Sequence, residues 1–170
     1  SKRNIKLNFK NMKKFYILAL SLATSLGSLY SQALQHNYSK SIGTTGSGET
    51  VNKIITDASG NTYAVGAFAG TVDFDPGTGT ANLTANVGPG ASGNDAFVAK
   101  YDANGNYVWA FKIGTGINFE DVARDITIDE LRNTIFYTGN FSGFNVDFDP
   151  SAASSTLSGG AQGVFVAHYT

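Results

Sequence analysis

The chain has 170 residues, of which 42% are hydrophobic and only 15% charged, with 20 glycines and no cysteine. This length suits about one domain, and the apolar fraction is large enough for a hydrophobic core. The absence of cysteine excludes a disulfide framework, a thiolate zinc site and a cysteine nucleophile, and the low charged fraction excludes a polyelectrolyte tail or a coiled coil.

Charge is distributed unevenly along the chain. Six of the 12 basic residues fall within the first 14 positions, whereas the part from Leu34 onward carries six basic and 13 acidic residues, a net charge of −7. A protein that binds nucleic acid needs clusters of Lys and Arg to meet the phosphate backbone, and the acidic body has none. Nucleic acid is therefore excluded as a partner.

The N-terminal region has the pattern of a secretory signal peptide. Residues 12–14 (Met-Lys-Lys) precede an apolar stretch, and small residues at 31 and 33 suit cleavage after Ala33. The alternative is a transmembrane anchor, but the stretch of roughly 16 residues is shorter than the ~20 needed to span a bilayer. We therefore expect residues 1–11 to be a non-native upstream extension, residues 12–33 to direct export, and the mature chain to start at Leu34 with no membrane span.

The body of the chain is internally repetitive. The pentapeptide Val-Asp-Phe-Asp-Pro occurs at residues 72–76 and again at 146–150. Further matches flank it in the same order, with a period of about 70 residues; they pair residues 38–43 with 109–114, 61–66 with 133–139, 68–70 with 141–143, and 97–101 with 165–169. Such a period indicates a repeat architecture. We therefore divide residues 34–170 into two repeats, at about 38–106 and 107–170.

Each repeat is expected to consist of short antiparallel strands. Segments rich in β-branched and aromatic residues lie at 51–56, 62–68, 96–101 and 107–113, and Asp- and Gly-containing hairpin turns follow at 57–61 and 102–106. Residues 119–131 could instead form a helix, but their repeat partner is strand-like, which favours a strand. Four antiparallel strands per repeat correspond to one blade of a β-propeller.

These motifs resemble the SBBP-type β-propeller repeat in its Asp-Phe-Asp-Pro variant. The resemblance covers about residues 38–170 and rests on the following positions: Asp57, Gly60, Asn61, Gly66, residues 95–102, Gly105 and Trp109. It implies a secreted protein of Bacteroidetes-like bacteria. The second copy departs from the pattern, because residues 130–132 replace the glycine-containing turn and Gly163 replaces Asp95, so we expect a different turn there.

Two blades are too few to close a propeller, which typically has 4–8. We therefore expect two four-stranded blades that are a fragment of a longer propeller, with the remaining blades of the same polypeptide as partners. The alternative is an open pair of sheets with exposed edges, which invite pairing with another chain.

The repeated Asp pairs are the best candidates for a metal site. Asp73 and Asp75 lie on one face of an extended segment, as do Asp147 and Asp149. Together with loop carbonyls they could hold Ca²⁺, which takes 6–8 oxygen ligands. The alternative, which we favour, is a buried Phe74 followed by an Asp-Pro turn.

Other candidate sites are weaker. Residues 88–93 match a dinucleotide fingerprint but neither follow a buried strand nor open a helix. The two histidines, His36 and His168, lie in contexts that do not suggest catalysis. Three acids could serve glycoside hydrolysis or could simply form a solvated edge: Glu120, Asp121 and Asp125. Trp109 and Tyr38 occupy equivalent repeat positions, which favours a core role over sugar stacking.

The sequence therefore predicts a secreted, non-catalytic β-propeller module with a structural, adhesive or ligand-binding role at the cell surface. Its partner would be an extracellular protein or glycan, and Ca²⁺ is the one cofactor suggested. The alternative is part of a secreted polysaccharide-acting hydrolase or lyase. Because catalytic residues should be unique to one blade, the presence of the most polar motif in both repeats favours the first reading.

Overall fold

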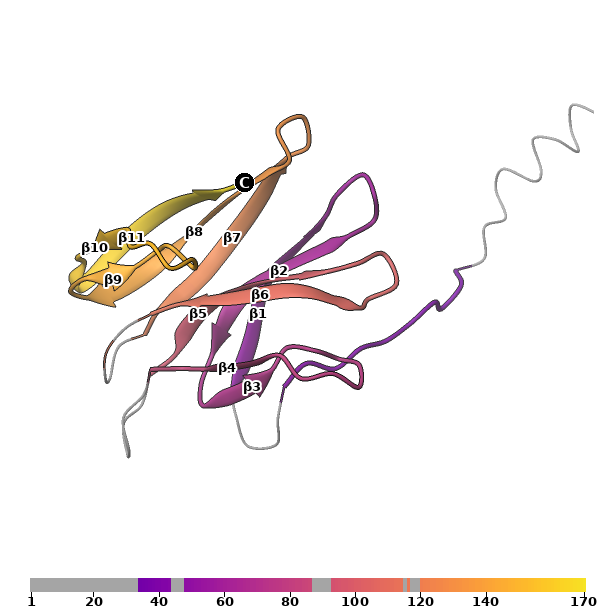
Figure 1. The fold of residues 1–170 in the computed structure, drawn as a ribbon, viewed down its shortest axis with the longest axis horizontal. Helices are drawn as coiled ribbons and strands as arrows, with labels where there is room; N and C mark the ends of the chain where they lie inside the picture. The colour runs from indigo at the N-terminus through magenta and orange to yellow at the C-terminus, as the bar shows by residue number, and fades with distance from the viewer. Residues whose placement is uncertain (1–33, 44–47, 87–92, 115, 117–119) are drawn as a thin grey trace, which may run out of the picture. The chain divides into compact units, whose positions relative to one another are not determined.

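The regular structure of the described residues is entirely β. The computed structural model describes residues 34–43, 48–86, 93–114, 116 and 120–170, and residues 38–170 form one unit, to which this description applies. The predicted signal peptide, the upstream extension and most of the loop at 88–93 lie outside the described residues. The strands are β1 (Glu49–Thr56), β2 (Thr62–Phe68), β3 (Thr71–Asp73), β4 (Asn82–Thr84), β5 (Asp95–Tyr101), β6 (Tyr107–Ile113), β7 (Val122–Asp129), β8 (Thr134–Gly143), β9 (Val146–Asp147), β10 (Thr156–Leu157) and β11 (Gly160–Tyr169) (Figure 1).

These elements confirm the all-β class. The ambiguous segment at 119–131 contains strand β7, as the repeat comparison predicted. Over the described part of the chain there is no helix, and hence no helix capable of crossing a membrane.

The first sheet has four antiparallel strands in the order β1-β2-β5-β6. The turns that join its hairpins form as predicted. Asp57 Oδ1 accepts the backbone N–H groups of Ser59 and Asn61. In the second turn, Asp102 Oδ1 accepts those of Asn104 and Asn106. Gly60 and Gly105 take the left-handed conformation that each turn requires, with φ of 82° and 76°.

The second sheet differs from the prediction in its number of strands. It has three strands, in the order β11-β8-β7, rather than four. Strand β6, which we assigned to the second repeat, pairs with β5 in the first sheet, because the tight turn at 102–106 makes the two a hairpin. Residues 38–43, the sequence counterpart of β6, lie outside any strand. The sequence repeat and the sheet are thus offset by one strand.

Each sheet carries a two-stranded ribbon inserted between its second and third strands. In the first sheet the ribbon is β3–β4, and in the second it is β9–β10 (Figure 1). The repeated pentapeptide supplies the first strand of each ribbon and the start of its loop.

The repeat extends to irregularities of the backbone. Strand β1 has a bulge between Val51 and Lys53, and β7 has one 72 residues later, between Ala123 and Asp125. A glycine of the neighbouring strand packs beneath each bulge. A Cβ atom on Gly66 would lie 1.8 Å from the Thr50 carbonyl oxygen, and one on Gly139 would lie 2.0 Å from that of Val122. Any other residue there would clash with the backbone.

The repeat also extends to aromatic packing. Three phenylalanines cluster on the first sheet and its ribbon, and their counterparts cluster on the second; the two sets are Phe68, Phe74 and Phe97, and Phe141, Phe148 and Phe165. The ring centroids are 5.5, 6.3 and 5.0 Å apart in the first set and 5.3, 6.2 and 4.9 Å apart in the second. The two repeats therefore build the same hydrophobic cluster.

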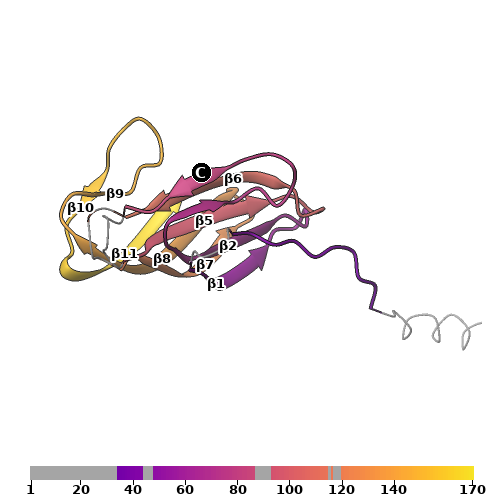
Figure 2. The same ribbon diagram turned by 90° about the horizontal axis from the view of Figure 1, so that it is seen from below.

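The two sheets pack face to face. We call the face of the first sheet that meets the second sheet its front, and the face of the second sheet that meets the first its back (Figure 2). The buried cluster between them combines front residues such as Val65 and Val98 with back residues such as Ile126 and Tyr137. Strands β1 and β7 lie side by side across this interface, where Lys53 Nζ is 3.3 Å from a carboxylate oxygen of Asp125.

Candidate functional site

The repeated Asp pairs organise the ribbon loops. Asp73 Oδ1 accepts the backbone N–H of Ala81 at 2.8 Å and that of Asp75 at 3.0 Å. Asp147 Oδ1 accepts the N–H of Asp149 at 3.0 Å and that of Ser155 at 2.9 Å. These backbone hydrogen bonds favour the ionised carboxylate and lower the pKa of both Asp73 and Asp147 below the usual value.

The second Asp of each pair starts the next turn. Asp75 Oδ1 accepts the N–H of Gly77 at 2.7 Å, and Asp149 Oδ1 accepts that of Ser151 at 2.8 Å. Within the described ranges, no group of three or more His, Cys, Asp or Glu side chains is placed to hold a metal ion. The hydrogen bonds account for the repeated carboxylates as loop-closing groups, and Ca²⁺ binding at these four residues stays a prediction.

The phenylalanine between the paired acids is buried, which confirms the prediction made for Phe74. Phe74 is fully buried, and its carbonyl oxygen accepts a hydrogen bond from the hydroxyl of Tyr101 at 3.1 Å. The hydroxyl of Tyr169 donates to the carbonyl of Phe148 in the same way. Burial raises the pKa of Tyr101 and of Tyr169, so both phenols remain protonated donors.

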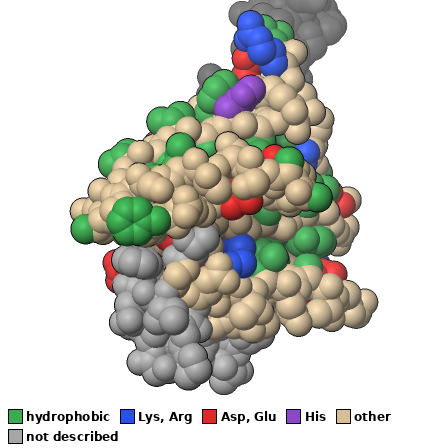
Figure 3. All heavy atoms as spheres, turned by 60° about the vertical axis from the view of Figure 1, so that its left-hand side comes forward, with side chains coloured by type: hydrophobic (Ala, Val, Ile, Leu, Met, Phe, Trp, Pro, Cys, Tyr) green, Lys and Arg blue, Asp and Glu red, His purple; other side chains and the backbone are tan. Residues whose placement is uncertain are grey.

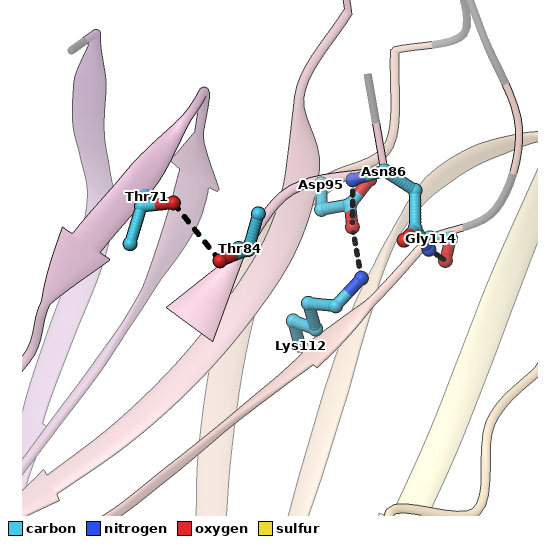
Figure 4. Close-up of polar contacts among 6 residues, drawn as sticks. All are labelled: Thr71, Thr84, Asn86, Asp95, Lys112 and Gly114. Atoms are coloured by element: carbon cyan, nitrogen blue, oxygen red, sulfur yellow. Dashed lines mark hydrogen bonds and ion pairs between the residues drawn. The ribbon is translucent and has the colours of Figure 1, made fainter. Parts of the chain in front are cut away.

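A buried ionic cluster lies at the end of the first sheet. Asp95, at the start of β5, has a side chain only 3% exposed, and its Oδ2 lies 2.6 Å from Lys112 Nζ on β6 (Figure 4). The same oxygen accepts the backbone N–H of Asn86 at 3.0 Å, and the amide of Asn86 donates to the carbonyl of Gly114 at 2.7 Å. The cluster thus ties together β5, β6 and the chain that follows β4.

A second buried carboxylate approaches this cluster. Asp121 is 1% exposed, and its Oδ1 accepts the N–H of Ser142 at 2.7 Å. A Cβ atom on Gly114 would lie 2.4 Å from Asp95 Oδ1 and 2.9 Å from Asp121 Oδ2. The two carboxylates therefore approach each other over Gly114, where a side chain would clash with both. Because both carboxylates are enclosed, they serve internal contacts at the ends of the two sheets.

The three acids considered for glycoside chemistry do not come together. Glu120 is exposed and Asp121 is buried. Asp125 forms an ion pair with Lys53, which lies on β1 of the first sheet. The sequence motifs include Asp95 only as part of the repeat pattern and predict no ion pair for it. A signal was present, because Asp95 lies among apolar strand residues where the other repeat has Gly163.

Of the remaining candidates, Trp109 and His168 pack on other rings, whereas His36 and Tyr38 are exposed. Trp109 is partly buried against the core, where it packs on Tyr63 and stacks on Phe111, with ring centroids 6.0 and 5.7 Å apart. His168 stacks on Phe136 at 4.5 Å, and His36 lies on the exposed segment before Tyr38. Tyr38 is 41% exposed, so the core role predicted for it together with Trp109 is wrong.

The visible surface presents no single-sign charged patch. On the face in Figure 3, acidic and basic side chains are interspersed with hydrophobic and polar ones. Comparisons with known proteins found no matching family model, no similar curated protein and no similar solved structure.

Proposed function

We propose that this chain is an exported β-propeller repeat module with a non-catalytic structural, adhesive or ligand-binding role at the cell surface. The observation that carries the proposal is how the repeated residues are used. The phenylalanine clusters and the loop-closing Asp73 and Asp147 have the same contacts in both repeats. These contacts build a scaffold, and scaffolds of this kind present variable loops to a partner.

The ionisable groups support a non-catalytic role. A hydrolase or lyase acting on polysaccharide needs two carboxylates flanking an accessible bond. The carboxylates that converge here, Asp95 and Asp121, are 2% and 1% exposed and serve internal hydrogen bonds. We therefore favour binding of an extracellular protein or glycan over the enzymatic alternative.

The proposal includes export and further blades. The basic start, apolar stretch and small residues before Leu34 support cleavage by a signal peptidase. The resemblance to SBBP-type repeats and the stacking of two similar sheets support a propeller with additional blades in the same polypeptide.

A binding screen with a hydrolysis assay tests the role. We expect the purified chain to bind a member of a glycan array or an extracellular matrix protein without releasing reducing ends from polysaccharides. A chain unfolded in urea is the control for non-specific adhesion. Release of reducing ends would establish the enzymatic alternative, and the absence of binding to either class of ligand would overturn the proposal.

N-terminal sequencing tests export separately. The exported protein should begin at Leu34, and a soluble cytoplasmic form that retains Met12 would contradict the assignment of residues 12–33.

A further inference from the structure

The front of the first sheet is buried against the second sheet, but the equivalent front of the second sheet is exposed. Three front residues of the first sheet are 1–3% exposed, and their repeat counterparts on the second sheet are 38–75% exposed; the pairs are Tyr63 and Phe136, Ala96 and Val164, and Val98 and Val166. The counterparts include two valines that are about three-quarters exposed. A strand face with such residues is normally covered.

Part of the other half of the interface is exposed on strand β1 of the first sheet, whereas the rest of this back is covered by ribbon β3–β4 and Ile42. On the back of the second sheet Ala123 and Ile126 are 0% and 4% exposed. Their counterparts on β1, Val51 and Ile54, are 52% and 61% exposed. The front of the second sheet and the back of the first are therefore the two complementary halves of an interface that the chain already forms once internally.

The charges at these two surfaces are complementary. Lys53 and Asp125 follow equivalent bulges and face Val65 and Thr138, which are themselves equivalent. They carry opposite charges and pair with each other inside the chain. If the internal interface were repeated between two copies, Asp125 of one copy would meet Lys53 of the next, and the charges would alternate along the assembly.

The strand pairing is complementary as well. Strand β11 is an edge of the three-stranded sheet, and among the described residues no strand pairs with its outer side. Residues 38–43 match the sequence of β6 but lie outside any strand. Ile42 packs against the cluster on the back of the first sheet, as its counterpart Ile113 packs into the cluster that contains the back of the second. The segment thus lies where the outer strand of a preceding sheet would lie.

We propose that, when the 170-residue chain is isolated, further copies take the place of the additional blades and associate head to tail. The front of the second sheet of one copy covers the back of the first sheet of the next, and residues 38–43 of the latter pair with β11 as its fourth strand. Such a heterologous contact closes into a ring or continues as a filament, and two copies supply four sheets, the smallest typical propeller. The proposal rests on the repeat architecture proposed above but not on the extracellular role or its ligand.

Two single variants test the contact. Val166→Lys places a charge on the front of the second sheet, and Ile54→Lys places one on the back of the first, each at an exposed position that tolerates it in the free chain. We expect the wild-type chain to be oligomeric by sedimentation velocity at about 100 µM, and each variant to be monomeric. Leu131→Lys, in a turn outside both surfaces and 95% exposed, is the matched control and should associate like the wild type.

Mixing the two variants is the decisive measurement. Each retains the half that the other lacks, so an equimolar mixture should form a one-to-one dimer and nothing larger. A wild-type chain that stays monomeric, or variants that associate like the wild type, would overturn the proposal. Neither result would affect glycan or protein binding by the single chain, so failure here is distinguishable from failure of the proposed function.

A disulfide tests the strand pairing itself. Phe111 pairs with Val98 in the first sheet. Lys40 is the repeat counterpart of Phe111, and Val166 is that of Val98, so Lys40 of one copy should lie opposite Val166 of another. The chain has no cysteine of its own. Lys40→Cys mixed with Val166→Cys should cross-link under mild oxidation, since directly opposed strand residues meet the distance requirement of a disulfide. Lys40→Cys mixed with Leu131→Cys is the control, and equal cross-linking of both mixtures would contradict the pairing.

Discussion

The first and second sheets share their interiors and differ at their margins. Both have the bulge with a glycine beneath it, the cluster of three phenylalanines and the tyrosine that bonds to a ribbon carbonyl. They differ in their strand number and at the sheet end, where the buried Asp95 of the first is replaced by Gly163 in the second. Buried packing tolerates little change in shape, whereas edges and turns accept other solutions.

The turn between the first two strands of each sheet illustrates this freedom. In the first sheet Gly60 provides the positive φ, and in the second Asn133 does so, with φ of 51°. Asparagine tolerates this conformation better than other side chains. Asp129 Oδ1 accepts the N–H groups of Leu131 and Arg132, in place of the Asp57 pattern. The different second turn that the sequence predicted is thus confirmed, and it leaves the hairpin intact.

The largest expected effect compares the two phenylalanine clusters. Phe74→Ala should destabilise the chain by about 3–5 kcal/mol, because a fully buried ring is replaced by a cavity. Phe148→Ala should cost no more than Phe74→Ala, because Phe148 is 7% exposed. Urea denaturation monitored by tryptophan fluorescence measures both. A clearly larger decrease in the free energy of unfolding for Phe148→Ala would contradict this order and show that the second cluster contributes more to stability than the first.

The next effect isolates the ionic cluster that only the first sheet has. Lys112→Met should cost about 3 kcal/mol, since it leaves the buried carboxylate of Asp95 without its cation. The matched control is Lys53→Met, which removes a solvent-exposed ion pair and should cost less than about 1 kcal/mol. The same denaturation experiment compares the two variants. Equal decreases in the free energy of unfolding would mean that burial of Asp95 does not determine how much its ion pair with Lys112 contributes to stability.

A smaller effect concerns the pH dependence of both ribbons. The pKa values of Asp73 and Asp147 are lowered in the folded chain by backbone hydrogen bonds, so their ionised forms favour folding. This contribution is fully present above the unfolded value near 3.8 and is lost as the pH falls through the lower folded pKa. Asp73→Asn with Asp147→Asn should make the loss of stability in acid less steep, measured as urea midpoints from neutral pH to about pH 2. An unchanged slope would contradict these roles.

The smallest expected effect is that of calcium on the repeated Asp pairs. If they bind Ca²⁺ with the weak affinity of extracellular sites, millimolar Ca²⁺ should stabilise the chain by about 1 kcal/mol and raise its Tm. Asp73→Asn with Asp75→Asn should remove the part of this increase due to the first ribbon and leave that due to the second. A Tm that is indifferent to both Ca²⁺ and chelator would reduce the pairs to loop-closing groups.

The sequence was informative wherever structure is local. Strands, the two glycine turns and the burial of Phe74 follow from alternation and turn chemistry over a few residues. The division into repeats places β6 in the wrong sheet, because a repeat comparison finds equivalent segments but not which sheet each one joins. The Asp95 cluster was missed because it depends on Lys112, 17 residues away, and on Asn86. Such contacts exist only after the hairpins have assembled.

The bulge and its glycine also define where the chain can be cut and rejoined. They come at the same place in successive sheets, so the stretch from Val51 to Val122 is a complete cassette with a sheet and its ribbon. Unequal recombination between the codons of Val51 and Ala123 would join β1 to the matching position of β7. The glycine that packs beneath the bulge would already be present in the neighbouring strand. The chain can therefore lengthen by whole cassettes, whereas a single inserted residue within β1 would turn the following side chains to the opposite face.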